Sequence, residues 1–139
     1  LLEKSAIITL HCPLTKETSR MFGARELAAM NDGTILVNTC RGEIFNQGDL
    51  IAALESGKLG GYATDVVEGE PIGADHVLLD TRNVIVTPHL GGYSVVSLHG
   101  MGQTMVDDMC RVFVEKAFPG VIANEKIDLA TSRIARFRA

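Results

Sequence analysis

The sequence has few cysteines and no paired arrangement of them. Its 139 residues include three cysteines, Cys12, Cys40 and Cys110, which lie far apart and form no Cys-x-x-Cys pair. An odd number of scattered cysteines excludes a disulfide scaffold and a zinc knuckle, and it fits a reducing compartment. The four histidines are scattered as well. We therefore expect no metal site.

A run of basic charge and a long apolar run are also missing. Lysine and arginine number 13 against 17 acidic residues, a net charge of −4, so binding to nucleic acid is not expected. No apolar stretch approaches the roughly 18 residues of a membrane-spanning helix, and residues 1–7 lack the order of a secretory signal. These absences predict a cytoplasmic protein that binds no membrane. Since the first residue is not methionine, we expect the natural N-terminus to lie upstream.

The composition and the apolar pattern indicate an α/β domain. Apolar residues make up 46% of the chain and charged residues 22%, the balance of a folded globular protein. Apolar runs predict strands, and helical spacing predicts helices, with a polar segment at 68–82. The strands are expected at 6–11, 34–39, 61–66 and 83–87, and the helices at 23–31, 47–56 and 94–117. This alternation favours a parallel sheet, either doubly wound or half of such a sheet.

The glycine-rich turn that binds nucleotide phosphates in such folds is missing. The nearest match, residues 100–105, has no third glycine and lies inside a predicted helix rather than after a strand. The cluster of Gly57, Gly60 and Gly61 follows a helix and precedes a strand, which reverses the required order. Neither segment is therefore a candidate phosphate site.

The ends of the predicted strands carry residues suited to chemistry on an anionic substrate. Arg41 follows the second strand, Asp65 ends the third with Glu70 beyond it, and His89 follows the fourth. Ligands of parallel sheets gather at this edge. An arginine offers a fork to a carboxylate, and a histidine beside a carboxylate can carry a proton. Each residue alone has an ordinary structural explanation, so it is their shared edge that favours a function.

Four motifs occur in order along this chain. They are His11-Cys12-Pro13-Leu14-Thr15-Lys16-Glu17-Thr18, Val37-Asn38-Thr39-Cys40-Arg41-Gly42-Glu43, the stretch 50–71 with Asp65-Val66 and Glu68-Gly69-Glu70-Pro71, and Asn83-Val84-Ile85-Val86-Thr87-Pro88-His89-Leu90-Gly91-Gly92. Together they resemble the D-isomer-specific 2-hydroxyacid dehydrogenases over about residues 2–117. The resemblance implies the second half of a Rossmann-like doubly wound parallel sheet with flanking helices.

The resemblance also implies a reaction, hydride transfer between NAD(P)H and a 2-keto acid or D-2-hydroxy acid. Arg41 then binds the substrate carboxylate, His89 protonates the carbonyl oxygen, and Glu70 pairs with His89. Formate-oxidising members have glutamine in place of Glu70, so Glu70 favours 2-keto acid reduction. A homodimer of the full-length protein, held through the cofactor domain and its long helix, is expected. The residues implied to contact the cofactor, NAD or NADP, are Cys12, Pro13, Thr18, Thr39, Cys40, Asp65, Gly91 and Gly92.

Family members are longer, and two of their parts have no counterpart in this sequence. These are the first half of the cofactor domain and the substrate domain. Residues 1–124 thus resemble the C-terminal portion of an NAD(P)-binding Rossmann domain, and 125–139 form a tail of unknown role. We expect the isolated chain to bind NADH weakly and to lack turnover. Two alternatives stay open: a non-catalytic, corepressor-like binding module, and a phosphite- or formate-type dehydrogenase on the same scaffold.

Overall fold

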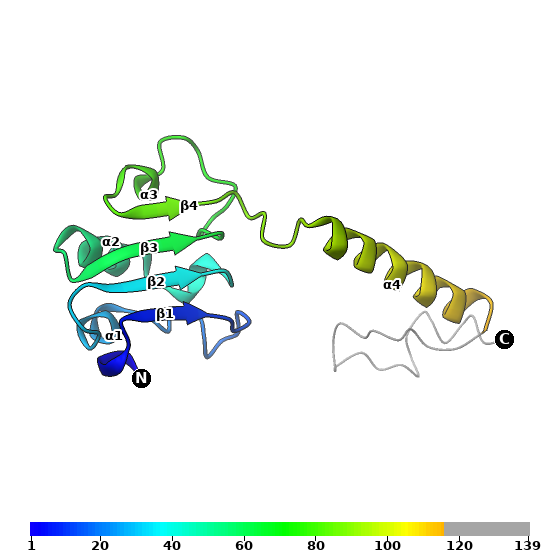
Figure 1. Ribbon diagram of the computed structural model, residues 1–139, viewed down its shortest axis with the longest axis horizontal. Coiled ribbons are helices and arrows are strands. Elements are labelled where there is room, and N and C mark those ends of the chain that lie inside the picture. Colours follow the sequence, from blue (N-terminus) through cyan, green and yellow to red (C-terminus); the bar gives the residue numbers. More distant parts are fainter. Residues whose placement is uncertain (116–139) are drawn as a thin grey trace. The chain divides into compact units, whose positions relative to one another are not determined.

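The computed structural model describes residues 1–115 (Figure 1). These residues fall into two units, Leu1–Gly91 and a second unit that begins at Gly92. The first unit is an α/β layer structure and the second begins with one long helix. The elements in chain order are η1 (Leu2–Lys4), β1 (Ile7–Leu10), α1 (Ala24–Ala28), β2 (Thr34–Asn38), η2 (Gly42–Ile44), α2 (Gln47–Glu55), β3 (Leu59–Thr64), α3 (Val77–Asp80), β4 (Val84–Val86) and α4 (Val95–Phe113), where η marks a 3-10 helix.

The four strands form one parallel sheet in the order β1-β2-β3-β4 (Figure 1). This confirms the α/β fold expected from the alternation of apolar runs and helices. The last residues of the strands, Leu10, Asn38, Thr64 and Val86, are register partners across the sheet. Because the strands end in line, the segments that follow all four of them leave the sheet at the same edge.

The core lies on one face of the sheet. Alternate residues of the strands, among them Ile8, Leu36 and Tyr62, are buried with Leu27 of α1 and Leu50 of α2. Helix α1 packs against α2, and α2 packs against β3. The strand residues that alternate with these have side chains on the other face of the sheet, and they include exposed isoleucines. The sheet is therefore covered on one face within the unit Leu1–Gly91.

Local signals explain where α2 begins and ends. The Asn46 side chain accepts hydrogen bonds from the backbone nitrogens of Gly48 and Asp49, which caps the first turn. Gly57, just past the helix, has a φ of 76°, the left-handed conformation that glycine adopts at helix ends. The predicted helix at 47–56 and its glycine stop are confirmed.

The structure differs from the sequence prediction at several places, and helix α1 ends at Ala28 rather than at residue 31. Strand β3 begins at Leu59, two residues earlier than expected, because Leu59 pairs with Thr34 across a register shift. The polar segment 68–82 contains the short helix α3, capped by the His76 side chain. The predicted long helix is present but ends at Phe113. The tail at 125–139 lies outside the described residues.

Two further features concern the described part of the chain as a whole. No helix among residues 1–115 is both long and apolar enough to cross a lipid bilayer. Within the same residues, no group of three or more histidine, cysteine or acidic side chains is arranged to hold a metal ion.

Candidate functional site

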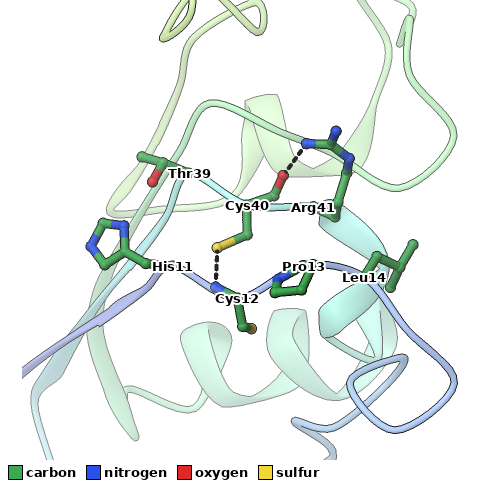
Figure 2. Close-up of a pocket in the computed structure, with 7 residues that line it drawn as sticks. All are labelled: His11, Cys12, Pro13, Leu14, Thr39, Cys40 and Arg41. Atoms are coloured by element: carbon green, nitrogen blue, oxygen red, sulfur yellow. Dashed lines mark hydrogen bonds between the residues drawn. The ribbon is translucent and has the colours of Figure 1, made fainter. Parts of the chain in front are cut away.

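A cavity of ≈ 530 Å³ opens at the ends of β1 and β2. Its lining comes from the segments 11–14 and 39–41, which face each other across it (Figure 2). Four residues expected to contact the cofactor line the cavity, together with the expected substrate-binding arginine. The full lining is His11, Cys12, Pro13, Leu14, Thr39, Cys40 and Arg41.

A buried asparagine shapes the turn that carries Arg41. Asn38, the last residue of β2, is fully buried, and its Nδ2 donates to the Arg41 carbonyl at 2.9 Å and to the Tyr62 hydroxyl at 3.2 Å. Its Oδ1 accepts from the backbone nitrogen of Cys40 at 3.0 Å. A buried amide with both ends bonded is costly to move. The backbone of residues 38–41 is thereby fixed at the end of the sheet.

The Arg41 guanidinium is held by a neutral group. Its Nη1 donates to the Cys40 carbonyl at 2.6 Å (Figure 2). The ion pairs among residues 1–115 use other cations, and none of them includes Arg41. A guanidinium carries five N–H donors. Arg41 therefore keeps donors and an unneutralised charge for a bound anion beside the cavity.

A second cluster lies at the ends of β3 and β4 and is organised around Asp65. The Asp65 Oδ1 accepts from the Thr87 hydroxyl and from the Leu90 nitrogen at 2.9 Å, and Oδ2 accepts from the Gly91 nitrogen at 2.7 Å. Gly91 has to be small there, since a Cβ atom on it would lie 2.9 Å from Oδ2. Burial pushes the pKa of Asp65 upward, but these hydrogen bonds outweigh it and hold the pKa below its ordinary value.

His89 lies in the middle of the segment that Asp65 holds. Its φ is 54°, a left-handed conformation that costs energy for a residue other than glycine, and its N–H donates to the Thr87 carbonyl at 2.9 Å. The bonds from Leu90 and Gly91 to Asp65 are what keep this backbone in place. Strain that the surroundings enforce is typical of functional positions.

The imidazole of His89 is paired with Glu70, the partner that the family resemblance implies. His89 Nδ1 contacts Glu70 Oε1, while Glu70 Oε2 accepts from the backbone nitrogen of Val67 at 3.1 Å. The side chains of His89 and Glu70 are 45% and 34% exposed, so a solute can reach the pair. A carboxylate at Nδ1 fixes the ring orientation. Within residues 1–115, Nε2 makes no hydrogen bond and is the free end of the ring.

In the described part of the chain, no hydrogen bond or ion pair joins Arg41 of the first cluster to His89 of the second. They are joined through the backbone at Gly42, which follows Arg41 and packs on the loop that leads to Glu70. A Cβ atom on Gly42 would lie 2.0 Å from the Glu68 nitrogen and 2.2 Å from the Val67 carbonyl carbon. The Arg41 loop can approach the Glu70 loop this closely because residue 42 has no side chain.

We expect Gly42→Ala to lower the free energy of unfolding of the 139-residue chain by about 1–3 kcal/mol, the usual cost of overpacking. The added methyl group meets backbone atoms that cannot rotate away. Urea unfolding followed by circular dichroism measures the effect. Gly48→Ala is the matched control, because its Cβ would have no neighbour nearer than Asn46 Oδ1 at 3.5 Å. Equal stabilities of the two variants would contradict the close contact at Gly42.

The lowered pKa of Asp65 predicts an acid dependence of stability. A carboxyl group whose pKa is lower in the folded chain stabilises the fold above its unfolded pKa, about 3.9 for aspartate. That contribution is lost as the pH falls through the folded pKa. We expect the urea midpoint to fall between about pH 5 and pH 3, and Asp65→Asn to reduce this slope. Asp75→Asn, at an exposed loop position, is the control. An unchanged slope in Asp65→Asn would refute the assignment.

Four residues expected at the cofactor, Thr18, Asp65, Gly91 and Gly92, lie outside the cavity lining. Asp65 and Gly91 belong to the cluster at the ends of β3 and β4. Thr18 folds the loop after β1, since its hydroxyl donates to the Pro13 carbonyl at 2.7 Å. Gly92 belongs to the second unit, and a Cβ atom on it would meet nothing within 4 Å. Sequence reasoning also missed residues of the site. Among them, His11 lines the cavity and Thr87 donates a hydrogen bond to Asp65, and both lie inside the motifs identified in the sequence. Their position next to motif residues is the signal that could have found them.

Comparison with known proteins identifies the family of the chain. Residues 1–91 match the D-isomer specific 2-hydroxyacid dehydrogenase family, NAD binding domain. The chain is 38% identical over 109 residues to glyoxylate/hydroxypyruvate reductase B of Escherichia coli, which covers 78% of this chain and 34% of the relative. It is 44% identical over 90 residues to hydroxypyruvate reductase of Blautia hydrogenotrophica, which covers 65% of this chain and 28% of the relative. The chain thus spans about a third of the length of these relatives.

Solved structures agree with the sequence matches. A D-isomer specific 2-hydroxyacid dehydrogenase of Lactobacillus delbrueckii ssp. bulgaricus, in its NAD complexed form, has a TM-score of 0.79 at 30% identity over 88% of this chain and 41% of that one. A family member from Xanthobacter autotrophicus Py2, in complex with NADPH and MES, has a TM-score of 0.70 at 33% identity over 80% of this chain and 45% of that one. The resemblance found in the four motifs is therefore confirmed, and this chain belongs to the D-isomer specific 2-hydroxyacid dehydrogenases, matching their NAD binding domain.

Proposed function

We propose that residues 1–91 supply the catalytic edge of an NAD(P)-dependent D-2-hydroxyacid dehydrogenase that reversibly reduces a 2-keto acid. The observation that carries the proposal is the pairing of His89 with Glu70 at the same sheet edge as an arginine without an acidic partner in the described chain. Reduction of a 2-keto acid needs a cation for the substrate carboxylate and an acid for the carbonyl oxygen. Arg41 and His89 are suited to these two tasks.

The work of each residue follows from its contacts. Arg41 binds the carboxylate through donors that the Cys40 carbonyl leaves free. Glu70 accepts at Nδ1 of His89 and so presents Nε2, with its proton, to the carbonyl oxygen of the substrate. In the reverse direction the same nitrogen takes the proton of the hydroxyl group. Asp65 keeps His89 in position by holding the backbone on its C-terminal side.

The residues present fit the nicotinamide end of a dinucleotide. The cavity at β1 and β2 is lined by the small side chains of Cys12, Thr39 and Cys40 together with larger ones that include Arg41. Gly91 has no side chain to crowd Asp65. A carboxylate has about four acceptor positions, and Asp65 uses three of them in this structure, which leaves one for a carboxamide. No Gly-x-Gly-x-x-Gly turn follows any strand among the described residues. When bound, the nicotinamide supplies the hydride.

A substrate panel tests the proposal in a complete enzyme. Residues 1–91 replace the matching segment of the Blautia hydrogenotrophica relative, which gives a hybrid enzyme with its other parts intact. We expect the hybrid enzyme to oxidise NADH with hydroxypyruvate or glyoxylate and to reduce NAD with neither formate nor phosphite. A hybrid that folds and binds NADH but turns over none of these favours the binding module, and oxidation of formate or phosphite favours the other dehydrogenase type.

We further propose that the protein is a homodimer of the cytoplasm. Helix α4 carries exposed apolar side chains at helical spacing, including Val95, Leu98, Met105 and Met109, which suit a partner helix. The three cysteines of the chain are free thiols, as in proteins of reducing compartments. Light scattering during gel filtration is expected to give twice the chain mass, and Leu98→Glu to shift the protein toward monomer. A monomer at all concentrations contradicts the dimer.

A further inference from the structure

Two cysteines lie opposite each other at the ends of β1 and β2. Leu10 pairs with Asn38 in the sheet, and Cys12 and Cys40 each follow two residues later. Neighbouring strands are about 4.7–4.9 Å apart, within the roughly 4.4–6.8 Å that a disulfide allows between Cα atoms. The register therefore brings the two residues to a separation that a disulfide can span.

A direct contact shows that Cys12 and Cys40 stay close together past the ends of the strands. The backbone nitrogen of Cys12 donates to the Cys40 sulfur at 3.1 Å. Figure 2 shows the Cys40 sulfur directed at Cys12, while the Cys12 side chain points away from it. The Cβ atom of Cys12 is two bonds from the nitrogen that Cys40 touches. A rotation about the Cα–Cβ bond of Cys12 therefore brings its sulfur toward that of Cys40.

We propose that Cys12 and Cys40 are a redox-active pair that forms a disulfide across the ends of β1 and β2 when the protein meets a peroxide. With hydrogen peroxide, the Cys12 thiol loses its proton and the thiolate attacks one peroxide oxygen. The O–O bond breaks, a sulfenic acid forms, and the departing hydroxide takes up a proton to become water. The Cys40 sulfur then attacks the Cys12 sulfur, the S–S bond forms, and the S–O bond breaks. The hydroxyl group leaves with the Cys40 proton as a second water, so two thiols are oxidised as one peroxide is reduced.

The burial of the two residues gives the order of these steps. Cys12 is half-buried, whereas Cys40 is only 8% exposed. Burial also raises the pKa of the Cys40 thiol, which keeps it protonated and slow toward oxidants in solution. Cys12 is thus the residue that meets the peroxide, and Cys40 is the neighbour that resolves the sulfenic acid.

The disulfide would form in the lining of the cavity that we assign to the substrate and cofactor. Both cysteines belong to that lining, and the Cys40 carbonyl is the group that holds Arg41. Oxidation would therefore fix segment 11–14 to segment 39–41 and restrict Arg41. The test of the disulfide does not depend on the proposed function, because it measures the oxidation state of the two cysteines rather than enzyme activity.

The test uses the full 139-residue chain with Cys110→Ser, which removes the exposed third cysteine. After a brief treatment with hydrogen peroxide, we expect an intact mass lower by about 2 Da and the loss of both free thiols, reversed by dithiothreitol. Peptide mapping should find the Cys12–Cys40 link. Cys12→Ser and Cys40→Ser in the same background are expected to gain oxygen instead and to form no internal link.

Three results would overturn the proposal. One is a folded chain that keeps both thiols under peroxide. Another is stepwise gain of about 16 Da per oxygen with no internal disulfide. The third is a disulfide that forms as fast in the urea-unfolded chain as in the folded chain. Its formation would then not depend on the alignment of β1 and β2.

Discussion

Replacing His89 with glutamine is expected to lower kcat of the hybrid enzyme for 2-keto acid reduction by about 100- to 10,000-fold, the usual contribution of a general acid. Glutamine keeps a side-chain N–H donor but has no proton to give up at neutral pH. Because Arg41 is untouched, KM for the keto acid should change little. Steady-state kinetics with NADH at saturation separate the two parameters.

The matched control for this prediction is His76→Gln. His76 caps the short helix α3, and in the described structure it makes no hydrogen bond or ion pair with Glu70 or Asp65 and is not part of the cavity lining. We expect this variant to retain kcat within about threefold of the parent. If His89→Gln also retained kcat, His89 would not be the acid and the assignment of the site would fail.

Replacing Arg41 with lysine is expected to raise KM for the keto acid about 10- to 100-fold, since charge-assisted hydrogen bonds contribute about 1.5–3 kcal/mol. Lysine keeps the charge but not the planar fork, and it cannot hold both the Cys40 carbonyl and a carboxylate in the same geometry. The KM for NADH should stay near that of the parent. Titration of both substrates distinguishes these effects.

Arg20→Lys serves as the comparison for Arg41. Arg20 is 64% exposed and already paired with Glu68 at 3.3 Å, so its charge is committed to a surface contact. Its substitution should leave KM for the keto acid within about twofold. An Arg41→Lys variant that behaves like Arg20→Lys would show that Arg41 does not bind the substrate carboxylate.

The strands were accessible from the sequence because apolar runs with turn residues on both sides carry a strong local signal, but their order in the sheet was not predicted. The edge argument then needed only the rule that parallel strands present ligand groups at their carboxyl ends. The register of Leu10, Asn38, Thr64 and Val86 shows that the four strands end in line, so the segments after them share one edge. The His89–Glu70 pair came from the resemblance as well as from position, and the structure contains it.

The parts that sequence reasoning missed depend on contacts between distant segments. Helix α3 is a single turn within a polar segment, too short for a periodic pattern. Gly42 has to be a glycine because the backbone at Val67 and Glu68 approaches it, which no local pattern reveals. The role of Thr87 depends on a carboxylate 22 residues earlier in the chain.

The most direct measurement of the central proposal follows the hydride itself. The hybrid enzyme is supplied with pyruvate or hydroxypyruvate and with NADH deuterated at both C4 positions. We predict a D-2-hydroxy acid that carries one deuterium on C2, about 1 Da heavier than the product of ordinary NADH, and only trace product from the His89→Gln hybrid. A product without deuterium on C2, a labelled product of L configuration, or no product from a folded hybrid that binds NADH would contradict the account.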